Sequence, residues 1–205
     1  MPQETKKQNA QEIILDAAER QLSHYGFNKM TMGDLAEEAG IGVGTIYLHF
    51  AGKADVAIAV IERSNQRVVE LLEAEAQAPT SPEVRLRSLL LKRILLRFEI
   101  VRHRSHQMEE VRAMIRKRNA VLPAYLRWFE AETQILAGVL REGRTQGLFD
   151  FEDAVLTAQT LLWSMDSLMP RNLKPYDFAS PDKVHSKTVR LADFALRSLR
   201  PLDKH

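Results

Sequence analysis

Residues 31–53 read TMGDLAEEAGIGVGTIYLHFAGK, and this stretch contains two short helical patterns separated by a tight turn. Thr31 is a favourable N-cap residue, and Asp34 follows at the spacing of a capping box, with Asp in place of Glu or Gln. Gly40 is placed to adopt the left-handed conformation that ends many helices. The first half of the stretch therefore predicts a helix from Thr31 to Ala39.

The second half begins after Gly42, which we expect to cap a helix from Val43 to Phe50. Ile46 and Phe50 lie four positions apart and therefore share one face of that helix. The other side chains then point more or less outward. A helix, a short turn containing glycine and a second short helix form the helix-turn-helix pattern. In DNA-binding versions the second helix enters the major groove.

The second helix also carries an unusual run of residues, Gly44-Thr45-Ile46-Tyr47-Leu48-His49-Phe50, which is followed by Lys53. The run resembles the G-x-[LI]-Y-x-H-F-x-x-K core of the TetR-like bacterial transcriptional repressors. The resemblance covers about the first quarter of the chain and extends back through residues 14–18, 25–27 and 31–40. Two positions depart from the family pattern. Val43 stands where a polar or basic residue is common, and Leu48 where an aromatic or polar residue is common.

The resemblance implies a DNA-contacting role for seven residues: Thr31, Val43, Gly44, Thr45, Tyr47, His49 and Lys53. Thr31, Tyr47, His49 and Lys53 carry donors suited to phosphate, while Thr45 suits a base edge or a phosphate. Gly44 lets the backbone approach the groove floor, and Val43 can touch a thymine methyl group but cannot make a bidentate contact to guanine. The alternative is that Tyr47 and His49 only pack a three-helix unit.

Composition sets the broad class of the protein. The chain has 205 residues, of which 45% are hydrophobic, and this suits a globular protein with a real core. No apolar run approaches the length of a membrane span, and the N-terminus lacks an apolar signal region, so we expect a cytoplasmic protein. The absence of cysteine excludes disulfides, cysteine metal sites and thiol redox sensing. Residues 1–53 hold five basic and seven acidic side chains, so DNA binding would rest on a few well-placed groups.

Apolar periodicity predicts an all-α fold with about nine helices and no strand. We expect a DNA-binding domain over residues 1–53 and a larger helical bundle for ligand binding and dimerisation over residues 54–205. The expected helices outside residues 31–53 are 8–25, 53–77, 83–101, 107–117, 123–146, 153–169 and 181–199.

The bundle contains large, adaptable side chains. If it resembles the TetR-like proteins throughout, it encloses a cavity for an apolar or amphipathic small molecule. Our candidates for its lining are Phe98, Met108, Met114, Trp128, Phe129 and Trp163. Plain core packing is the alternative for each of them. Residues 97–118 carry a basic excess that would attract an anionic ligand, but this stretch also suits a solvated surface.

The last two expected helices are more apolar than one core requires, so we predict a homodimer through residues 153–169 and 181–199. The alternative is that both are interior helices. One recognition helix reads few base pairs, and a symmetric dimer would bind a palindromic DNA operator.

Glu99, His103, His106 and Glu110 would share a face only if one helix ran unbroken through them, and surface polarity explains them as well as a metal site does. We therefore predict no metal site and no cofactor. The chain shows no motif of nucleophilic, phosphate-binding or metalloprotease type, so we expect no enzyme.

These observations predict a ligand-responsive transcriptional regulator, a repressor that a small molecule releases from its operator. Two rivals stay open. One is a DNA-binding dimer without a ligand, and the other is a small-molecule carrier or enzyme that keeps the helix-turn-helix only as structure.

Overall fold

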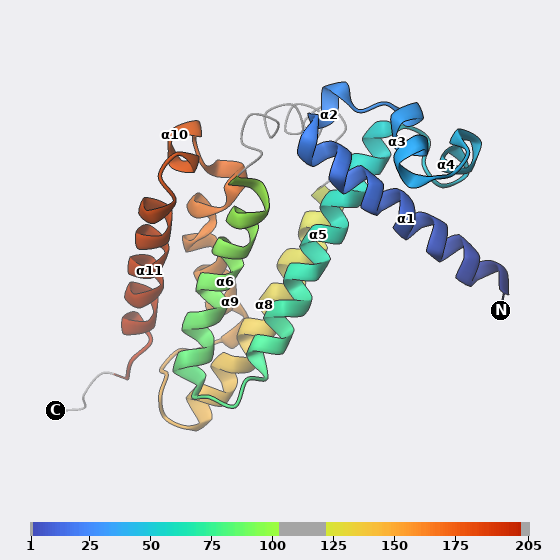
Figure 1. The fold of residues 1–205 in the computed structure, drawn as a ribbon. Helices are drawn as coiled ribbons and strands as arrows, with labels where there is room; N and C mark the ends of the chain where they lie inside the picture. Colours follow the sequence, from blue (N-terminus) through green and yellow to red (C-terminus); the bar gives the residue numbers. More distant parts are fainter. Residues whose placement is uncertain (1, 103–121, 202–205) are drawn as a thin grey trace. The chain divides into compact units, whose positions relative to one another are not determined.

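The computed structural model describes residues 2–102 and 122–201 (Figure 1). Within these ranges all regular structure is helical, with ten α-helices and two short 3-10 helices. The described residues form two compact units, residues 2–64 and residues 65–102 with 123–201. The expected all-α class is confirmed. The first unit extends beyond the expected domain boundary at Lys53, because side chains up to Ser64 bind its first helix.

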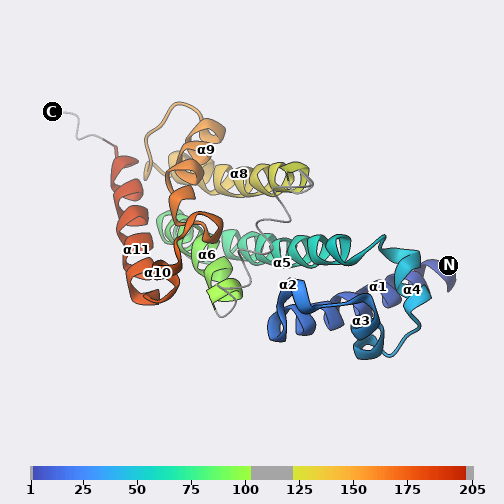
Figure 2. The ribbon, with the colours of Figure 1, turned by 90° about the horizontal axis from the view of Figure 1, so that it is seen from above.

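The first unit contains four helices and the start of a fifth: α1 (Pro2–His24), α2 (Gly26–Lys29), α3 (Met32–Ala39), α4 (Val43–His49) and α5 (Lys53–Ala76). In Figures 1 and 2, α1 runs alongside α3, and α3 is followed by the short α4. Its core takes the apolar face of each helix, with Ile14, Met30, Leu35, Ile46 and Val56 fully buried. This core holds α4 by a single face.

The helix ends in this unit match the expectations from sequence. Thr31 caps α3 by accepting a hydrogen bond from the Asp34 N–H, with 3.1 Å between Oγ1 and N. Gly40 ends α3 with φ of 65°, a left-handed conformation that favours glycine. Gly42 is the N-cap of α4. These local signals place the turn between α3 and α4.

Ion pairs join α1 to its neighbours on two sides. Arg20 Nε donates to Glu38 Oε1 on α3 over 2.6 Å. The hydrogen bond from Arg20 lowers the pKa of the Glu38 carboxyl group. On α5 the Arg63 guanidinium binds three carboxylates of α1, those of Glu12, Asp16 and Glu19, at 2.7–2.9 Å. These ion pairs therefore link α1 to α3 on one side and to α5 on another.

The second unit contains the rest of α5, then α6 (Pro82–Arg102), α8 (Leu122–Thr145), α9 (Ala154–Ser164), α10 (Pro175–Phe178) and α11 (Pro181–Ser198). The 3-10 helices η1 (Asp166–Leu168) and η2 (Pro170–Asn172) lie between α9 and α10. Helices α6 and α11 lie side by side (Figure 1), and Arg87 joins them by donating to Asp193 over 2.7 Å. The core of this unit is a set of aliphatic, phenylalanine and methionine side chains from all its long helices.

A charged network lies inside this core. Glu132 of α8 accepts from Arg93 Nε at 2.7 Å and from Arg97 Nη2 at 2.5 Å, and the side chains of all three are at most 8% exposed. Arg97 also donates to Asn65 of α5, and Arg93 donates to the Leu162 carbonyl of α9. Burial lowers the pKa of Arg97, while the negative charge of Glu132 opposes that shift. One carboxylate therefore stabilises two buried cations.

The end of α8 depends on two glycines. Gly147 has φ of 72° and ends the helix as expected, and the N–H of Leu148 donates to the carbonyl of Gly143 over 2.9 Å. The ring of Phe149 lies directly on Gly143. A Cβ atom at Gly143 would lie 2.3 Å from Cδ2 of Phe149, so no larger residue fits there without movement.

Several helices differ from the sequence expectation. Helix α9 ends at Ser164 and continues as η1, where the expected helix ran to Met169. The four-residue helices α2 and α10 were not expected, because they are too short to show periodicity. The helix expected over residues 107–117 lies outside the described residues.

No single described helix is long and apolar enough to cross a membrane. Helices α4 and α5 meet that length and composition only as a pair, which is bent by 63°.

Candidate nucleic-acid interface

Helix α4 is anchored by one side chain and exposed elsewhere. Ile46 is fully buried and Phe50, directly after the helix, is 7% exposed. Val43, Tyr47 and Leu48 are 45%, 54% and 80% exposed. The structure therefore presents a short helix whose outer face is available to a partner. It brings five of the seven predicted DNA-contacting residues together on that helix: Val43, Gly44, Thr45, Tyr47 and His49.

The polar groups on this face have no hydrogen-bond partner among the described residues. The Tyr47 hydroxyl, the Thr45 hydroxyl and the His49 ring form no hydrogen bond with any described residue. His49 packs its ring near Phe50, with 6.5 Å between ring centroids. Such donors suit phosphate oxygens or base edges, because DNA would satisfy groups that the fold leaves to water.

The residue expected to let the backbone approach DNA is in open surroundings. A Cβ atom added at Gly44 would meet no atom within 4 Å. Leu48, which we did not predict as a contact, is the most exposed large apolar side chain of the described chain. The helical spacing from buried Ile46 was the signal that could have identified it.

Thr31 lies at the start of α3 with its hydroxyl already bound. The hydroxyl donates to the Asp34 carboxylate, with 2.7 Å between oxygen atoms, while accepting from the Asp34 N–H. Its local role is to cap the helix. A phosphate contact by this hydroxyl stays a prediction that would require exchange of the bond to Asp34.

Lys53 also has internal partners. Its Nζ donates to the carbonyl oxygens of Phe27, Asn28 and Met30 at 3.2, 3.2 and 3.3 Å. The same ammonium lies 4.9 Å from the centroid of the Phe27 ring. An ammonium group has three donors, and three carbonyls take them. Lys53 therefore joins the start of α5 to the end of α2, and its predicted phosphate contact would compete with that bond.

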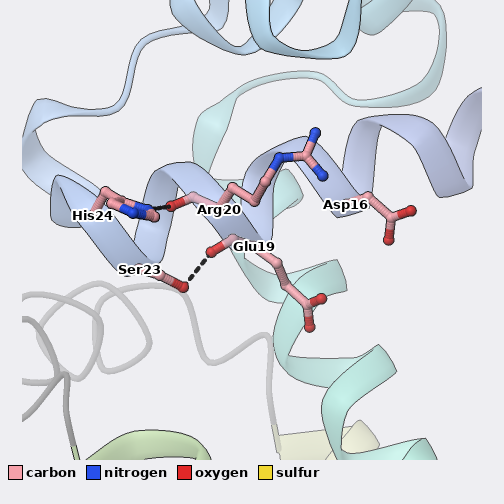
Figure 3. A pocket seen from close by; sticks show the side chains of 5 residues that line it. All are labelled: Asp16, Glu19, Arg20, Ser23 and His24. Atoms are coloured by element: carbon pink, nitrogen blue, oxygen red, sulfur yellow. Dashed lines mark hydrogen bonds between the residues drawn. The ribbon is translucent and has the colours of Figure 1, made fainter.

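A shallow depression of about 280 Å³ lies on α1, lined by Asp16, Glu19, Arg20, Ser23 and His24 (Figure 3). Ser23 donates to the Glu19 carbonyl and the His24 ring contacts the Arg20 carbonyl, both within the helix. Asp16 and Glu19 bind Arg63, and Arg20 binds Glu38. The polar groups of this depression are therefore largely used inside the protein.

The predicted ligand-lining residues fall in different surroundings. Phe98 is buried and stacks on Phe178 with 5.6 Å between centroids. Phe129 stacks on Trp163 at 5.9 Å, but Trp163 is 55% exposed at the surface of the second unit. Trp128 is half-buried. The structure brings Phe129 and Trp163 together and places Phe98 in a separate small cluster. Met108 and Met114 lie outside the described residues.

The last two long helices carry exposed apolar side chains. Leu156 and Trp163 of α9 are 59% and 55% exposed, and Phe194 of α11 is 65% exposed. On other faces the two helices contribute to the core, α9 with Leu162 and α11 with Ala192. Each helix therefore has one face in the core of its own unit and apolar groups on another.

The described residues contain no group of three histidine, aspartate or glutamate side chains placed to hold a metal ion. Of the four residues considered for such a site, Glu99 is exposed, and His103, His106 and Glu110 lie outside the described ranges.

The buried anchor, the capped turn and the exposed second helix define a helix-turn-helix DNA-binding protein. Residues 14–60 match the family model "Bacterial regulatory proteins, tetR family". The transcriptional regulator TtgR of Pseudomonas putida is 31% identical over 166 residues, which cover 73% of this chain and 76% of TtgR. The transcriptional regulator AcrR of Shigella flexneri is 34% identical over 133 residues, which cover 58% of this chain and 62% of AcrR.

Solved structures agree on the fold. A TetR transcription regulator from Haloarcula marismortui superimposes with a TM-score of 0.72 at 21% identity, covering 94% of this chain and 98% of that one. The efflux-pump repressor SmeT of Stenotrophomonas maltophilia gives a TM-score of 0.63 at 19% identity, covering 94% of this chain and 91% of SmeT. The chain belongs to the TetR family, and it is a transcriptional regulator that binds DNA, as the sequence predicted.

Proposed function

We propose that this protein is a repressor that binds a palindromic operator as a homodimer. The observation that carries the proposal is the outer face of α4, beside the buried Ile46. There the Tyr47 hydroxyl, the Thr45 hydroxyl and the His49 ring form no hydrogen bond within residues 2–102 and 122–201. With α4 in the major groove, Tyr47 and His49 bind phosphates, Thr45 binds a base edge or phosphate, and Gly44 and Val43 approach the bases. Thr31 and Lys53 hold the framework in position.

The first unit would bind DNA with few ionic contacts. Residues 1–53 hold five basic and seven acidic side chains, and Arg20 and Lys53 are engaged inside the protein. Each neutralised phosphate contributes about 0.9 to the slope of log affinity against log salt concentration. We therefore expect a weak salt dependence for a DNA-binding protein, with recognition carried by hydrogen bonds and shape.

Dimerisation would use α9 and α11. Leu156, Trp163 and Phe194 expose large apolar side chains on these two helices, and burying them against a second copy would remove apolar surface from water. A two-fold axis would place these apolar side chains of one copy against the same side chains of the other. The two recognition helices would then face successive major-groove segments, about one helical turn or more apart.

The effector would be an apolar or amphipathic small molecule that binds the bundle. The support comes from similar folds: SmeT has been crystallised with triclosan, and FadR of Bacillus subtilis with stearoyl-CoA. The effector would favour an arrangement of the dimer that does not fit the operator, and it can act only through its different affinities for the two arrangements. This is a binding role without catalysis, and a repressor of this class works in the cytoplasm.

A DNA-binding dimer without an effector is the second candidate. The observations that favour it are that Trp163 is exposed at the surface and that Phe98 stacks on Phe178 within a small apolar cluster.

A two-stage experiment tests the proposal. Operators are first selected from a random duplex pool, and amphipathic compounds are then screened for an increase in the unfolding temperature. A compound that stabilises the protein should weaken operator binding, and saturating operator should weaken the compound's binding by the same factor. Stabilising compounds that leave operator affinity unchanged would favour the second candidate. Failure to enrich any duplex would contradict both.

A further inference from the structure

One apolar side chain occupies the centre of the exposed face of α4. Successive residues of an α-helix are rotated by about 100°, so positions two before and two after a residue lie nearly opposite to it. Ile46 is the fully buried anchor of α4. Gly44 and Leu48 are therefore the residues that point away from the protein, and Gly44 has no side chain.

The polar residues of α4 lie to either side of this centre. By the same rotation Tyr47 and Thr45 are each about a quarter turn from Ile46, in opposite directions. A helix inserted in the major groove with its anchor outward would direct these two toward the walls of the groove, where the phosphates are. The residue directed at its floor is Leu48, which is 80% exposed.

Isolated exposed leucines are common on protein surfaces and need no explanation by themselves. The position of Leu48 is what distinguishes it. Because an added Cβ at Gly44 would meet no atom within 4 Å, the surface beside Leu48 is bare helix backbone. A base edge can therefore reach the leucine methyl groups without displacing another side chain.

A leucine in the major groove can contact only one apolar feature of the base pairs, the 5-methyl group of thymine. We propose that Leu48 is a specificity-determining residue that contacts a thymine methyl group in each half of the operator. The inference rests on the proposed binding of α4 in the major groove. It assigns the apolar base contact to Leu48, where the residue types of the sequence had pointed to Val43.

The test removes single methyl groups from DNA. An operator selected by the wild-type protein is synthesised with deoxyuridine in place of each thymidine, one symmetric pair at a time, which removes the methyl group and keeps base pairing. For one such pair we expect wild-type affinity to fall by about fourfold per methyl group, or about fifteenfold for both half-sites. The Leu48→Ala variant should bind the thymine and uracil duplexes equally.

Three further proteins complete the comparison. Leu48→Met keeps an apolar side chain and should retain the preference for thymine. Leu71→Ala changes an exposed leucine of α5 and should behave as wild type. Val43→Ala should keep the wild-type ratio of affinities for the thymine and uracil duplexes. The inference is overturned if Val43→Ala abolishes this preference for thymine and Leu48→Ala does not. It is equally overturned if no uracil duplex binds more weakly than its thymine parent. A failure of the proposed function looks different, because then no operator is selected.

Discussion

The ammonium nitrogen of Lys53 lies 3.2 Å from the carbonyl oxygen of Phe27, across 26 residues of sequence. It also binds the carbonyls of Asn28 and Met30, so the residue that starts α5 closes the end of α2. Helices α3 and α4 lie between these two points in the chain. Lys53 therefore fixes both ends of the segment that contains the recognition helix.

Replacing Lys53 by Met should remove the three hydrogen bonds and keep an apolar stem beside Phe27. We expect the free energy of unfolding to fall by about 1–2 kcal/mol, because hydrogen bonds of charged groups contribute about 1.5–3 kcal/mol and solvent screens this half-buried ammonium. The salt slope of operator binding should stay unchanged. Chemical denaturation and titrations at several salt concentrations measure the two quantities. A slope reduced by about 1.8 with unchanged stability would instead assign Lys53 to a phosphate in each half-site.

Tyr47→Phe should weaken DNA binding without affecting folding, because the hydroxyl has no hydrogen-bond partner in the described part of the chain and Tyr47 is 54% exposed. A hydrogen bond to a charged phosphate contributes about 1.5 kcal/mol per subunit. The loss should be the same for cognate and scrambled duplexes, since phosphate contacts carry no sequence information. Fluorescence anisotropy with both duplexes measures it, and a loss confined to the cognate duplex would show that Tyr47 reads a base.

The residues that were predictable from sequence are those that act locally. Thr31, Gly40 and Gly42 determine helix ends within a few residues of themselves, and the structure has them as expected. Lys53 could not be interpreted in this way, because its partners belong to α2, a helix of four residues without periodicity. From the sequence, a lysine near a recognition helix suggests a phosphate contact. The carbonyl oxygens that bind Lys53 are known only from the structure.

The bundle was harder to predict for the same reason. Arg93 and Glu132 are 39 residues apart, and composition does not distinguish a buried charged residue from a solvated one. Trp163 is apolar in type, but its exposure depends on how α9 packs. Periodicity shows which residues share a helix face, but it does not show which helices pack together. The lining of a ligand site depends on that packing and therefore could not be assigned from the sequence.

Glu132→Gln should strongly destabilise the protein. It would leave Arg93 and Arg97 charged and buried together, with no buried carboxylate between them. Removing one partner of a buried ion pair costs about 3–5 kcal/mol. Glu130→Gln is the matched control, because Glu130 is an exposed residue on the same helix that accepts a hydrogen bond from Gln134. Denaturation curves should separate the two variants, and equal stabilities would show that the network does not support the core.

The combined substitutions Leu156→Glu and Phe194→Glu should convert the dimer to a monomer. Charges placed on apolar surface that dimerisation buries would be desolvated without partners. Both side chains are more than half exposed in the single chain, so folding should be preserved. Sedimentation at micromolar concentration gives the mass, with Leu71→Glu as an exposed control elsewhere in the second unit. A variant that still sediments as a dimer would place the interface on other helices.

Hydroxyl-radical footprinting on a selected operator tests most directly whether this chain reads DNA as a symmetric dimer through α4. We predict two protected half-sites related by a dyad, with centres about one helical turn or more apart. Protection should weaken in both half-sites together with Tyr47→Phe. A single asymmetric footprint, or a footprint that does not change with Tyr47→Phe, would contradict this mode of binding.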